Sequence, residues 1–243
     1  MHTYSFTNSL VHLMSVFDPA FLSSKRIVDL SQPITADMPT YPGDPSPRIE
    51  VLSTIDKGGS NTTRIVLSAH AGTHVDVPYH LLESGKAVDE LSLKAFCGSA
   101  VTYNLTHKAK GSRICPDDLE PSLLLSDGEI ALFYTGSNDS AMNGSARCSC
   151  THLDTAMADL LIEKRVKAVG IDSMSVDSLD SSESEVHKKL LQNDIVIFEN
   201  LSNNLRLLVG KHALFFGMPL KLVRADASPV RAFALCESDN KSY

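Results

Sequence analysis

Long apolar runs and an excess of basic residues are both missing from the 243-residue sequence. No apolar run approaches the roughly 20 residues that a membrane-spanning helix needs, so we expect no transmembrane segment. The 22 Lys and Arg residues against 29 Asp and Glu residues leave a formal net charge of −7. This acidic balance argues against nucleic acid or an anionic membrane as the main partner, and we expect a small-molecule substrate instead.

A regular cysteine spacing is also lacking. The five cysteines are an odd number without a repeating interval, which does not indicate a disulfide framework. We therefore expect reduced thiols in a cytoplasmic protein. Cys148 and Cys150 are two positions apart, whereas metal-binding cysteine pairs usually leave two residues between them, so we interpret them as neither metal nor redox residues.

Residues 1–25 have no basic start and no uninterrupted apolar stretch, so they do not indicate a signal peptide. We interpret them as an N-terminal extension. It is either an amphipathic helix that packs on a neighbouring subunit or a poorly ordered terminus. Residues 26–243 form one domain in this interpretation, because no linker divides them.

Short strand-like runs alternate with helical patterns along this domain. Most of the runs are apolar throughout, which is typical of strands covered on both faces. The expected strands are Ile27–Leu30, Thr62–Ala69, Ala100–Leu105, Glu129–Thr135, Val166–Ile171, Asp194–Glu199 and Val230–Leu235. The polar segment Asn138–Ser149 is expected to be a surface loop.

Two helices are expected between these strands. The first begins at a Thr151 cap and the second at a Ser182 or Ser184 cap. Their inward residues are expected to be Leu153, Ala156, Met157, Leu160 and Leu161 in the first helix, and Val186, Leu190 and Leu191 in the second. The order of elements predicts an α/β or α+β domain with a substantial sheet.

Three histidines and an aspartate lie close together in the segment His70–His80, which reads His-Ala-Gly-Thr-His-Val-Asp-Val-Pro-Tyr-His. His70, His74, Asp76 and His80 are of the residue types that bind a divalent transition metal. The glycine, the β-branched residues and the proline argue against a helix. In an extended strand, the four even-numbered positions all point to one face.

A straight strand would keep His70 and His74 about 13 Å apart, because each residue rises ~3.3 Å. Gly72 permits a bulge or sharp bend that brings the two rings together. Pro78 offers no N–H group and ends the regular ladder. His80 is therefore expected just beyond the strand, close to the ligands but freer to move.

This segment resembles the His-x-Gly-Thr-His-x-Asp-x-Pro-x-His signature of the putative cyclase family, which includes bacterial-type kynurenine formamidases and isatin hydrolases. The resemblance covers roughly residues 26–236. Its further segments are 28–34 (Val-Asp-Leu-Ser-Gln-Pro-Ile), 41–45 (Tyr-Pro-Gly-Asp-Pro), 169–177 (Val-Gly-Ile-Asp-Ser-Met-Ser-Val-Asp), 198–201 (Phe-Glu-Asn-Leu), 216–220 (Phe-Gly-Met-Pro-Leu) and 226–232 (Asp-Ala-Ser-Pro-Val-Arg-Ala).

The resemblance implies a swivelling β/β/α fold with a central mixed sheet flanked by helices, a homo-oligomer (dimer or tetramer), and hydrolysis of an amide-type bond. It implies that His70, His74 and Asp76 are metal ligands and that His80 is catalytic.

The resemblance also implies a second metal position. In the formamidases a His and a Glu hold a second ion and the Asp bridges the two ions, and these residues match His187 and Glu199 here. The implied cofactor is zinc, as in the formamidases, or manganese, as in isatin hydrolase, with one or two ions per chain. Asp172 and Asp177 are interpreted as residues that structure a loop rather than as ligands.

The chemistry follows from these residues. A bound metal lowers the pKa of water from 15.7 towards about 7 and polarises a carbonyl group, so we expect attack by metal-bound hydroxide. His80, with an unperturbed pKa of about 6.5, is expected to take a proton from the attacking water and give one to the leaving amine. No Gly-x-Ser-x-Gly elbow is present, which argues against a serine hydrolase.

We expect the protein to be an arylformamidase that hydrolyses a substrate such as N-formylkynurenine. The alternatives are ring opening of a cyclic amide such as isatin and, less favoured, a metal-binding protein without turnover. The sequence departs from the family after Gly136, where an aromatic-rich stretch is replaced by Ser-Asn-Asp-Ser, and Trp is absent from the whole chain. The aromatic candidates to stack on an aryl ring are Phe17, Phe21 and Tyr41.

Overall fold

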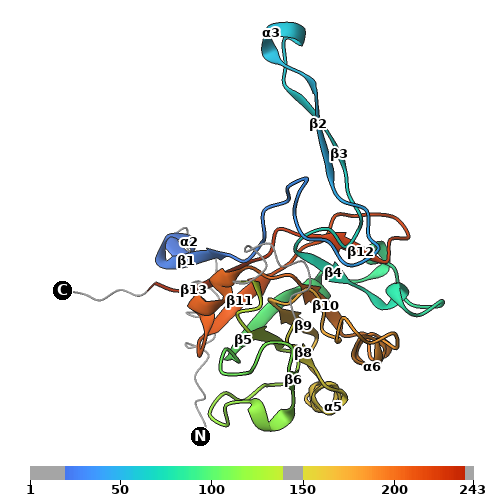
Figure 1. Ribbon diagram of the computed structural model, residues 1–243. Helices are drawn as coiled ribbons and strands as arrows, with labels where there is room; N and C mark the ends of the chain where they lie inside the picture. The colour runs from blue at the N-terminus through green and yellow to red at the C-terminus, as the bar shows by residue number, and fades with distance from the viewer. Residues whose placement is uncertain (1–19, 139–149, 239–243) are drawn as a thin grey trace, which may run out of the picture.

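A nine-stranded mixed sheet forms the body of the protein in the computed structural model, which describes residues 20–138 and 150–238 (Figure 1). Its strands are β1 (Lys25–Asp29), β4 (His74–Asp76), β5 (Cys97–Asn104), β7 (Ile130–Tyr134), β9 (Ala168–Ile171), β10 (Val196–Glu199), β11 (His212–Phe216), β12 (Ala227–Pro229) and β13 (Phe233–Glu237). They lie in the order β1-β13-β11-β5-β7-β9-β10-β4-β12. The run β5-β7-β9-β10 is parallel and the remaining pairs are antiparallel. The expected α/β class and central mixed sheet are confirmed.

Each central strand contributes to two hydrophobic cores, one on each face of the sheet. In β7, Ile130 and Leu132 pack into one core, whereas Ala131 and Phe133 pack into the other. Helices α5 (Thr155–Glu163) and α6 (Glu185–Gln192) cover the second of these faces. Because both faces are covered, the strand residues are apolar throughout, as the sequence predicts.

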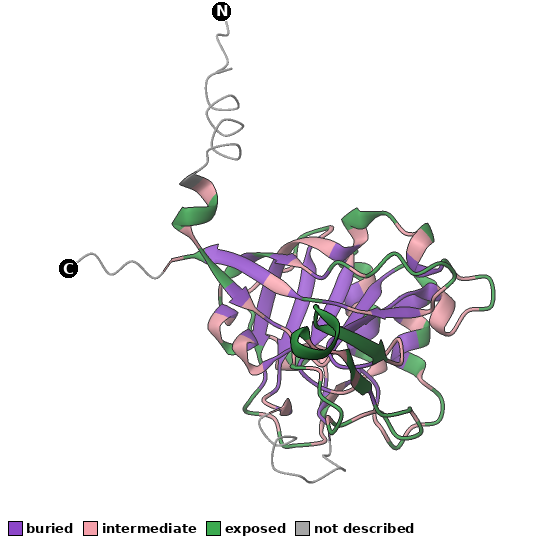
Figure 2. Cartoon of the chain, turned by 90° about the horizontal axis from the view of Figure 1, so that it is seen from above, coloured by how far each residue is buried: buried purple, intermediate pink, exposed green. Residues whose placement is uncertain are grey.

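Smaller elements surround the sheet. They are α2 (Ala20–Ser24), α3 (Ile55–Gly58), the hairpin β2 (Arg48–Ser53) and β3 (Thr62–Val66), the pair β6 (Arg113–Ile114) and β8 (His152–Leu153), and short 3₁₀ helices at Pro78–His80, Val88–Glu90, Leu93–Phe96, Pro116–Asp118 and Asn203–Leu208. The β2–β3 hairpin projects from the body with α3 at its tip (Figure 1), and it is exposed where the sheet is buried (Figure 2). Strand β3, which was expected from its sequence, is exposed and is not one of the strands covered on both faces.

The start of α5 differs from the sequence-based expectation, whereas α6 begins after Ser184 as expected. Helix α5 begins at Thr155 rather than after Thr151, because the Asp154 carboxylate caps it by accepting a hydrogen bond of 2.8 Å from the Met157 N–H. Ser184 occupies the cap position of α6, but its side chain makes no cap hydrogen bond. The inward face of α6 is confirmed, since Val186, Leu190 and Leu191 are buried as predicted.

Several predictions fall outside the residues that the structure describes. These are residues 1–19 of the N-terminal extension, the loop after Asn138, and Cys148. Cys97, Cys115, Cys150 and Cys236 take part in no disulfide within the part of the chain that the structure describes. Within residues 20–138 and 150–238, no helix combines the length and apolar character needed to cross a membrane.

Candidate active site

The pairing of β4 with β10 brings one histidine and two carboxylate side chains to one face of the sheet. His74 lies opposite Glu199, and Asp76 lies opposite Ile197. Directly paired residues point to the same face, so His74, Asp76 and Glu199 share the face that carries α6. The intervening Val75 points to the opposite core. The strand alternation thus separates the polar site from the apolar packing that fixes it.

Helix α6 closes this face with His187. Its Nε2 atom lies 3.4 Å from Asp76 Oδ2 and 3.2 Å from Glu199 Oε1. Only 8% of the His187 side chain is exposed to solvent, and burial of Val186 and Leu190 on either side fixes the helix beneath it. His187 and Glu199, the expected ligands of a second ion, therefore meet at Asp76.

His70 reaches the same carboxylate from outside the strand. Gly72 has a φ of +66°, a conformation that favours glycine, so the chain turns sharply there as the sequence predicts. The turn places His70 Nδ1 2.9 Å from Asp76 Oδ1. The centroids of the His70 and His74 rings lie 5.1 Å apart. Of the four residues, β4 contains only His74 and Asp76, so the single strand face expected for all of them is wrong for His70, whereas His80 lies just beyond the strand as expected.

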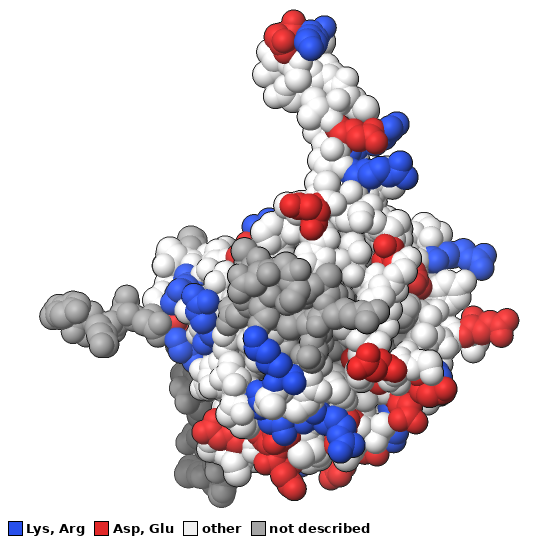
Figure 3. Space-filling view, in the orientation of Figure 1, with Lys and Arg blue, Asp and Glu red and all other residues white. Residues whose placement is uncertain are grey.

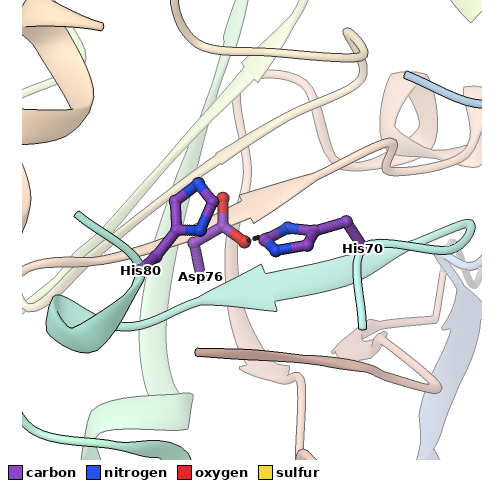
Figure 4. A group of neighbouring side chains, drawn as sticks. All are labelled: His70, Asp76 and His80. Carbon is purple, nitrogen blue, oxygen red and sulfur yellow. Dashed lines mark ion pairs between the residues drawn. The ribbon is translucent and has the colours of Figure 1, made fainter. Parts of the chain in front are cut away.

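His80 ends the 3₁₀ helix that begins at Pro78. Figure 4 shows His70 and His80 on either side of Asp76, with the His70–Asp76 ion pair marked. One potential ligand atom from each of these three residues lies within 4.8 Å of the others, and the same holds for His74, Asp76 and Glu199. The Asp76 carboxylate is common to both groups.

Each of the three inner histidines has its second nitrogen held by an acceptor. His74 Nδ1 lies 2.9 Å from the Gly72 carbonyl oxygen, and His187 Nδ1 lies 2.6 Å from Asp177 Oδ2. His70 Nε2 lies 3.0 Å from Asp226 Oδ2. The other nitrogen of each ring is left facing the Asp76 carboxylate. This pattern is typical of metal-binding histidines, whose outer N–H is fixed by a carboxylate or a backbone carbonyl.

The electrostatics of the site also fit a cation. Asp76 Oδ1 is buried, and the ring nitrogens His70 Nδ1 and His74 Nε2 lie 2.9 Å and 3.5 Å from it. Burial by itself raises the pKa of Asp76, but the charge of His74 and the hydrogen bonds of His187 and His70 outweigh it and hold the pKa well below its usual value. Burial likewise lowers the pKa of His187, yet the Glu199 charge and the bonds to Asp177 and Asp76 raise it well above its ordinary value. The buried carboxylates therefore require positive charge, from protons or from a metal ion.

The site opens into a cavity of about 270 Å³. The histidine and carboxylate groups form one end of it. Hydroxyl-bearing residues form much of the remaining lining: Thr40, Tyr41, Ser175, Ser178, Ser181 and Ser184. Of the predicted aromatic residues, Tyr41 lines the cavity, Phe21 lies in α2 beside Lys25, and Phe17 is outside the described residues.

Comparison with known proteins identifies the family. The family model described as Putative cyclase matches residues 28–178. This chain belongs to that family. The kynurenine formamidase of Bacillus anthracis is 32% identical over 212 residues, which cover 87% of this chain and 98% of the formamidase. Because this likeness extends over most of both proteins, we assign this cyclase-family chain as an amide hydrolase.

Solved structures agree with this assignment. A predicted metal-dependent hydrolase from Bacillus stearothermophilus is 27% identical, with a TM-score of 0.72 over 87% of this chain and 98% of its own. An isatin hydrolase bound to the product analogue thioisatinate has a TM-score of 0.83 over 97% of this chain and 100% of its own. That second likeness, at 20% identity, concerns the fold alone.

One residue beside the site was missed by the sequence reasoning. Asp226 lies 146 positions from His80, so no local spacing pointed to it, although it opens one of the segments shared with the cyclase family. Asp177 and Asp172 were expected to structure loops; Asp172 does, whereas Asp177 caps α6 and holds the His187 ring. Asp172 accepts hydrogen bonds from Thr135 and Gly136, and burial raises its pKa to about 6 despite these bonds.

Proposed function

We propose that this cyclase-family protein is a metal-dependent arylformamidase that hydrolyses N-formylkynurenine. The observation that carries the proposal is the convergence of three histidines on the shared Asp76 carboxylate, each with its outer nitrogen already held. The likeness to the Bacillus anthracis kynurenine formamidase supports the choice of substrate.

The metal ligands follow from which side of Asp76 each residue faces. His70 Nδ1 and His74 Nε2 face Asp76 Oδ1, and these three residues would hold one ion. His187 Nε2 faces Asp76 Oδ2 and, with Glu199, would hold a second. Imidazole and carboxylate ligands together suit zinc or manganese. Such ions, when bound, supply the positive charge that polarises a carbonyl group and lowers the pKa of water to about 7.

His80 is placed to move the protons of the reaction. Its side chain is 27% exposed, and it lines the cavity next to the ligand groups. In the proposed reaction, His80 accepts a proton from the water that attacks the formyl carbon. It then donates a proton to the arylamine nitrogen as the C–N bond breaks, which yields formate and the free amine. His80 is thus the proposed catalytic residue.

The hydroxyl-lined wall suits the polar amino-acid part of N-formylkynurenine. Ser178 and Ser181 can each donate or accept a hydrogen bond, and Tyr41 offers a ring face for the aryl group. Isatin is a compact cyclic amide with fewer polar groups to use this wall. The acyclic substrate therefore fits the cavity chemistry better than the cyclic one.

The deciding experiment compares kcat/KM for N-formylkynurenine and isatin on the metal-loaded protein. We expect a clear preference for N-formylkynurenine and loss of turnover after chelation. A preference for isatin would overturn the substrate while keeping the hydrolase. A fully metal-loaded protein that turns over neither substrate would favour a metal-binding protein without turnover.

We also propose that the protein is a homo-oligomer that uses the β2–β3 hairpin as an interface. The register places Ile49, Ile65 and Val51 on one face of the hairpin, whereas the Glu50–Arg64 ion pair lies on the other. These three apolar side chains are 43%, 59% and 69% exposed. Figure 3 shows charged side chains at the tip of the hairpin and again partway along it, with uncharged surface between them. A two-stranded hairpin is marginally stable alone, so burial against a second copy would stabilise it.

Light scattering coupled to gel filtration tests this interface. Val51→Asp and Ile65→Asp should lower the mass to that of one chain. Glu50→Gln, on the opposite face, is the matched control and should leave the mass unchanged. A wild-type mass of one chain, or an unchanged mass in both Asp variants, would remove the hairpin from the interface.

A further inference from the structure

Asp226 is held beside the site by its backbone on both sides. Its carbonyl oxygen accepts a hydrogen bond of 3.2 Å from the Val77 N–H. The preceding carbonyl, of Ala225, accepts one of 3.0 Å from the Val88 N–H. The next residue, Ala227, begins β12 and pairs with Asp76 in β4. The position of the Asp226 carboxylate is therefore set by the sheet that carries the proposed ligands.

One oxygen of this carboxylate serves two histidine rings. Asp226 Oδ2 lies 3.0 Å from His70 Nε2 and 3.2 Å from His80 Nδ1. The two rings lie 4.5 Å apart, centroid to centroid, with their planes tilted by 50°. A single acceptor thus links the proposed proton-transfer residue to a proposed metal ligand.

His80 needs such a partner, because its own element does little to orient its ring. It ends a 3₁₀ helix of three residues, and its side chain is partly exposed. Among the described residues, Asp226 supplies the hydrogen bond that the structure records for this ring. A neutral imidazole carries its proton on either nitrogen, and an acceptor at one nitrogen fixes the proton there.

We propose that Asp226 is a positioning residue that keeps the His80 proton on Nδ1 and leaves Nε2 free to exchange protons with water and substrate. The inference rests on the proposed proton-transfer role of His80. The same carboxylate orients His70 through Nε2, so that its Nδ1 faces Asp76. Asp226 acts through these two rings and does not itself touch the reacting atoms.

Asp226→Asn is the central variant, because its amide group retains the size of the carboxylate but can present an N–H group to His80 Nδ1. At saturating metal, we expect kcat to fall by ~10²-fold, the scale typical of a lost general acid/base, with little change in KM. Metal affinity should fall by ~10-fold, the usual effect of removing an outer partner from a ligating histidine. Asp89→Asn is the matched control, since the Asp89 carboxylate anchors the Arg224 N–H in the same loop but touches neither ring.

A double-mutant cycle separates positioning from an independent role. At saturating metal in a His80→Ala background, Asp226→Asn should cost little further activity, because the His80 ring is gone and excess metal offsets the weaker hold on His70. A full additional loss would show that Asp226 acts on substrate or metal directly and would overturn the proposal. Loss of metal at saturating concentration would do the same, because it would make Asp226 a ligand.

Nitrogen-15 NMR of the His80 ring in the zinc-loaded protein tests the proton position without any turnover. The wild-type ring should carry its proton on Nδ1, and Asp226→Asn should shift the population towards Nε2. An unchanged proton position would overturn the inference even if the protein proved to be a formamidase. Conversely, the expected shift in a protein that does not hydrolyse N-formylkynurenine would reject only the proposed substrate.

Discussion

Helix α6 offers a sharp test of how the site is held, because its cap comes from Asp177, which lies outside the helix and nine residues before Val186. Asp177 Oδ1 accepts a hydrogen bond of 3.0 Å from the Val186 N–H, and Asp177 Oδ2 accepts one of 3.0 Å from the His187 N–H. The same Oδ2 atom lies 2.6 Å from His187 Nδ1. One carboxylate therefore caps the helix and orients the ring. Asp177→Ala removes all three contacts at once.

The expected loss in the free energy of unfolding follows from these contacts. Loss of a helix cap typically costs about 1–2 kcal/mol, and loss of a hydrogen bond to a charged group about 1.5–3 kcal/mol. Since the contacts share one side chain, we expect a combined loss of roughly 2–4 kcal/mol in the free energy of unfolding. At ~2–4 °C per kcal/mol for a chain of this size, the melting temperature should fall by roughly 5–15 °C. Ser184→Ala, at the formal cap position, should cost less than about 0.5 kcal/mol.

Thermal unfolding of the metal-free variants, followed by circular dichroism, measures both changes. The difference between wild type and Asp177→Ala should also depend on pH. Burial raises the pKa of Asp177, but the hydrogen bonds and charge of His187 outweigh it and lower the pKa below 3.8. The stabilising contribution is thus present above about pH 4 and is lost as the pH falls through the folded-state pKa. Equal destabilisation by the two variants would refute Asp177 as the cap.

The other predictions concern the metal and the proton. His74→Ala should lose metal and hydrolysis together, as measured by elemental analysis and rate; full activity without metal would end the metal proposal. His80→Ala should keep its metal but lose ~10²-fold in rate, and an emptied site would make His80 a ligand. Glu199→Ala should lose about one metal equivalent, and an unchanged stoichiometry would indicate that Glu199 holds no ion. Burial lowers the pKa of His70, but Asp226 and Asp76 raise it to about 10, so metal binding should release protons and strengthen with pH; calorimetry in buffers of different ionisation enthalpy would detect the release.

The parallel strands and the histidine segment were predictable from the sequence because both are local patterns. Apolar runs around Ile130 and Val196 show strands buried on two faces, and Gly72 predicts the turn that brings His70 back. The spacing from His70 to His80 needs no distant information. The exact start of the strand at His74 was not predictable, because it depends on pairing with β10 and β12.

The remaining features depend on contacts between distant segments. Strand β12 has only three residues, and its Ala-Ser-Pro sequence carries no strand pattern. The β2 strand was missed because its residues face solvent on both sides of a hairpin, so it lacks the apolar run of a buried strand. The cap of α6 was assigned to a serine next to the helix, whereas tertiary structure supplies it from Asp177.

The position of β4 between β10 and β12 bears on how the protein is made. The ribosome completes the segment from His70 to His80 well before either neighbouring strand, because Val196–Glu199 and Ala227–Pro229 are more than 100 residues away in sequence. Strand pairs between segments so far apart in sequence form late in folding. A growing chain therefore carries unassembled histidines until β12 has been synthesised. Metal capture would then accompany the final closure of the sheet, and chains truncated before β12 would lack a complete site.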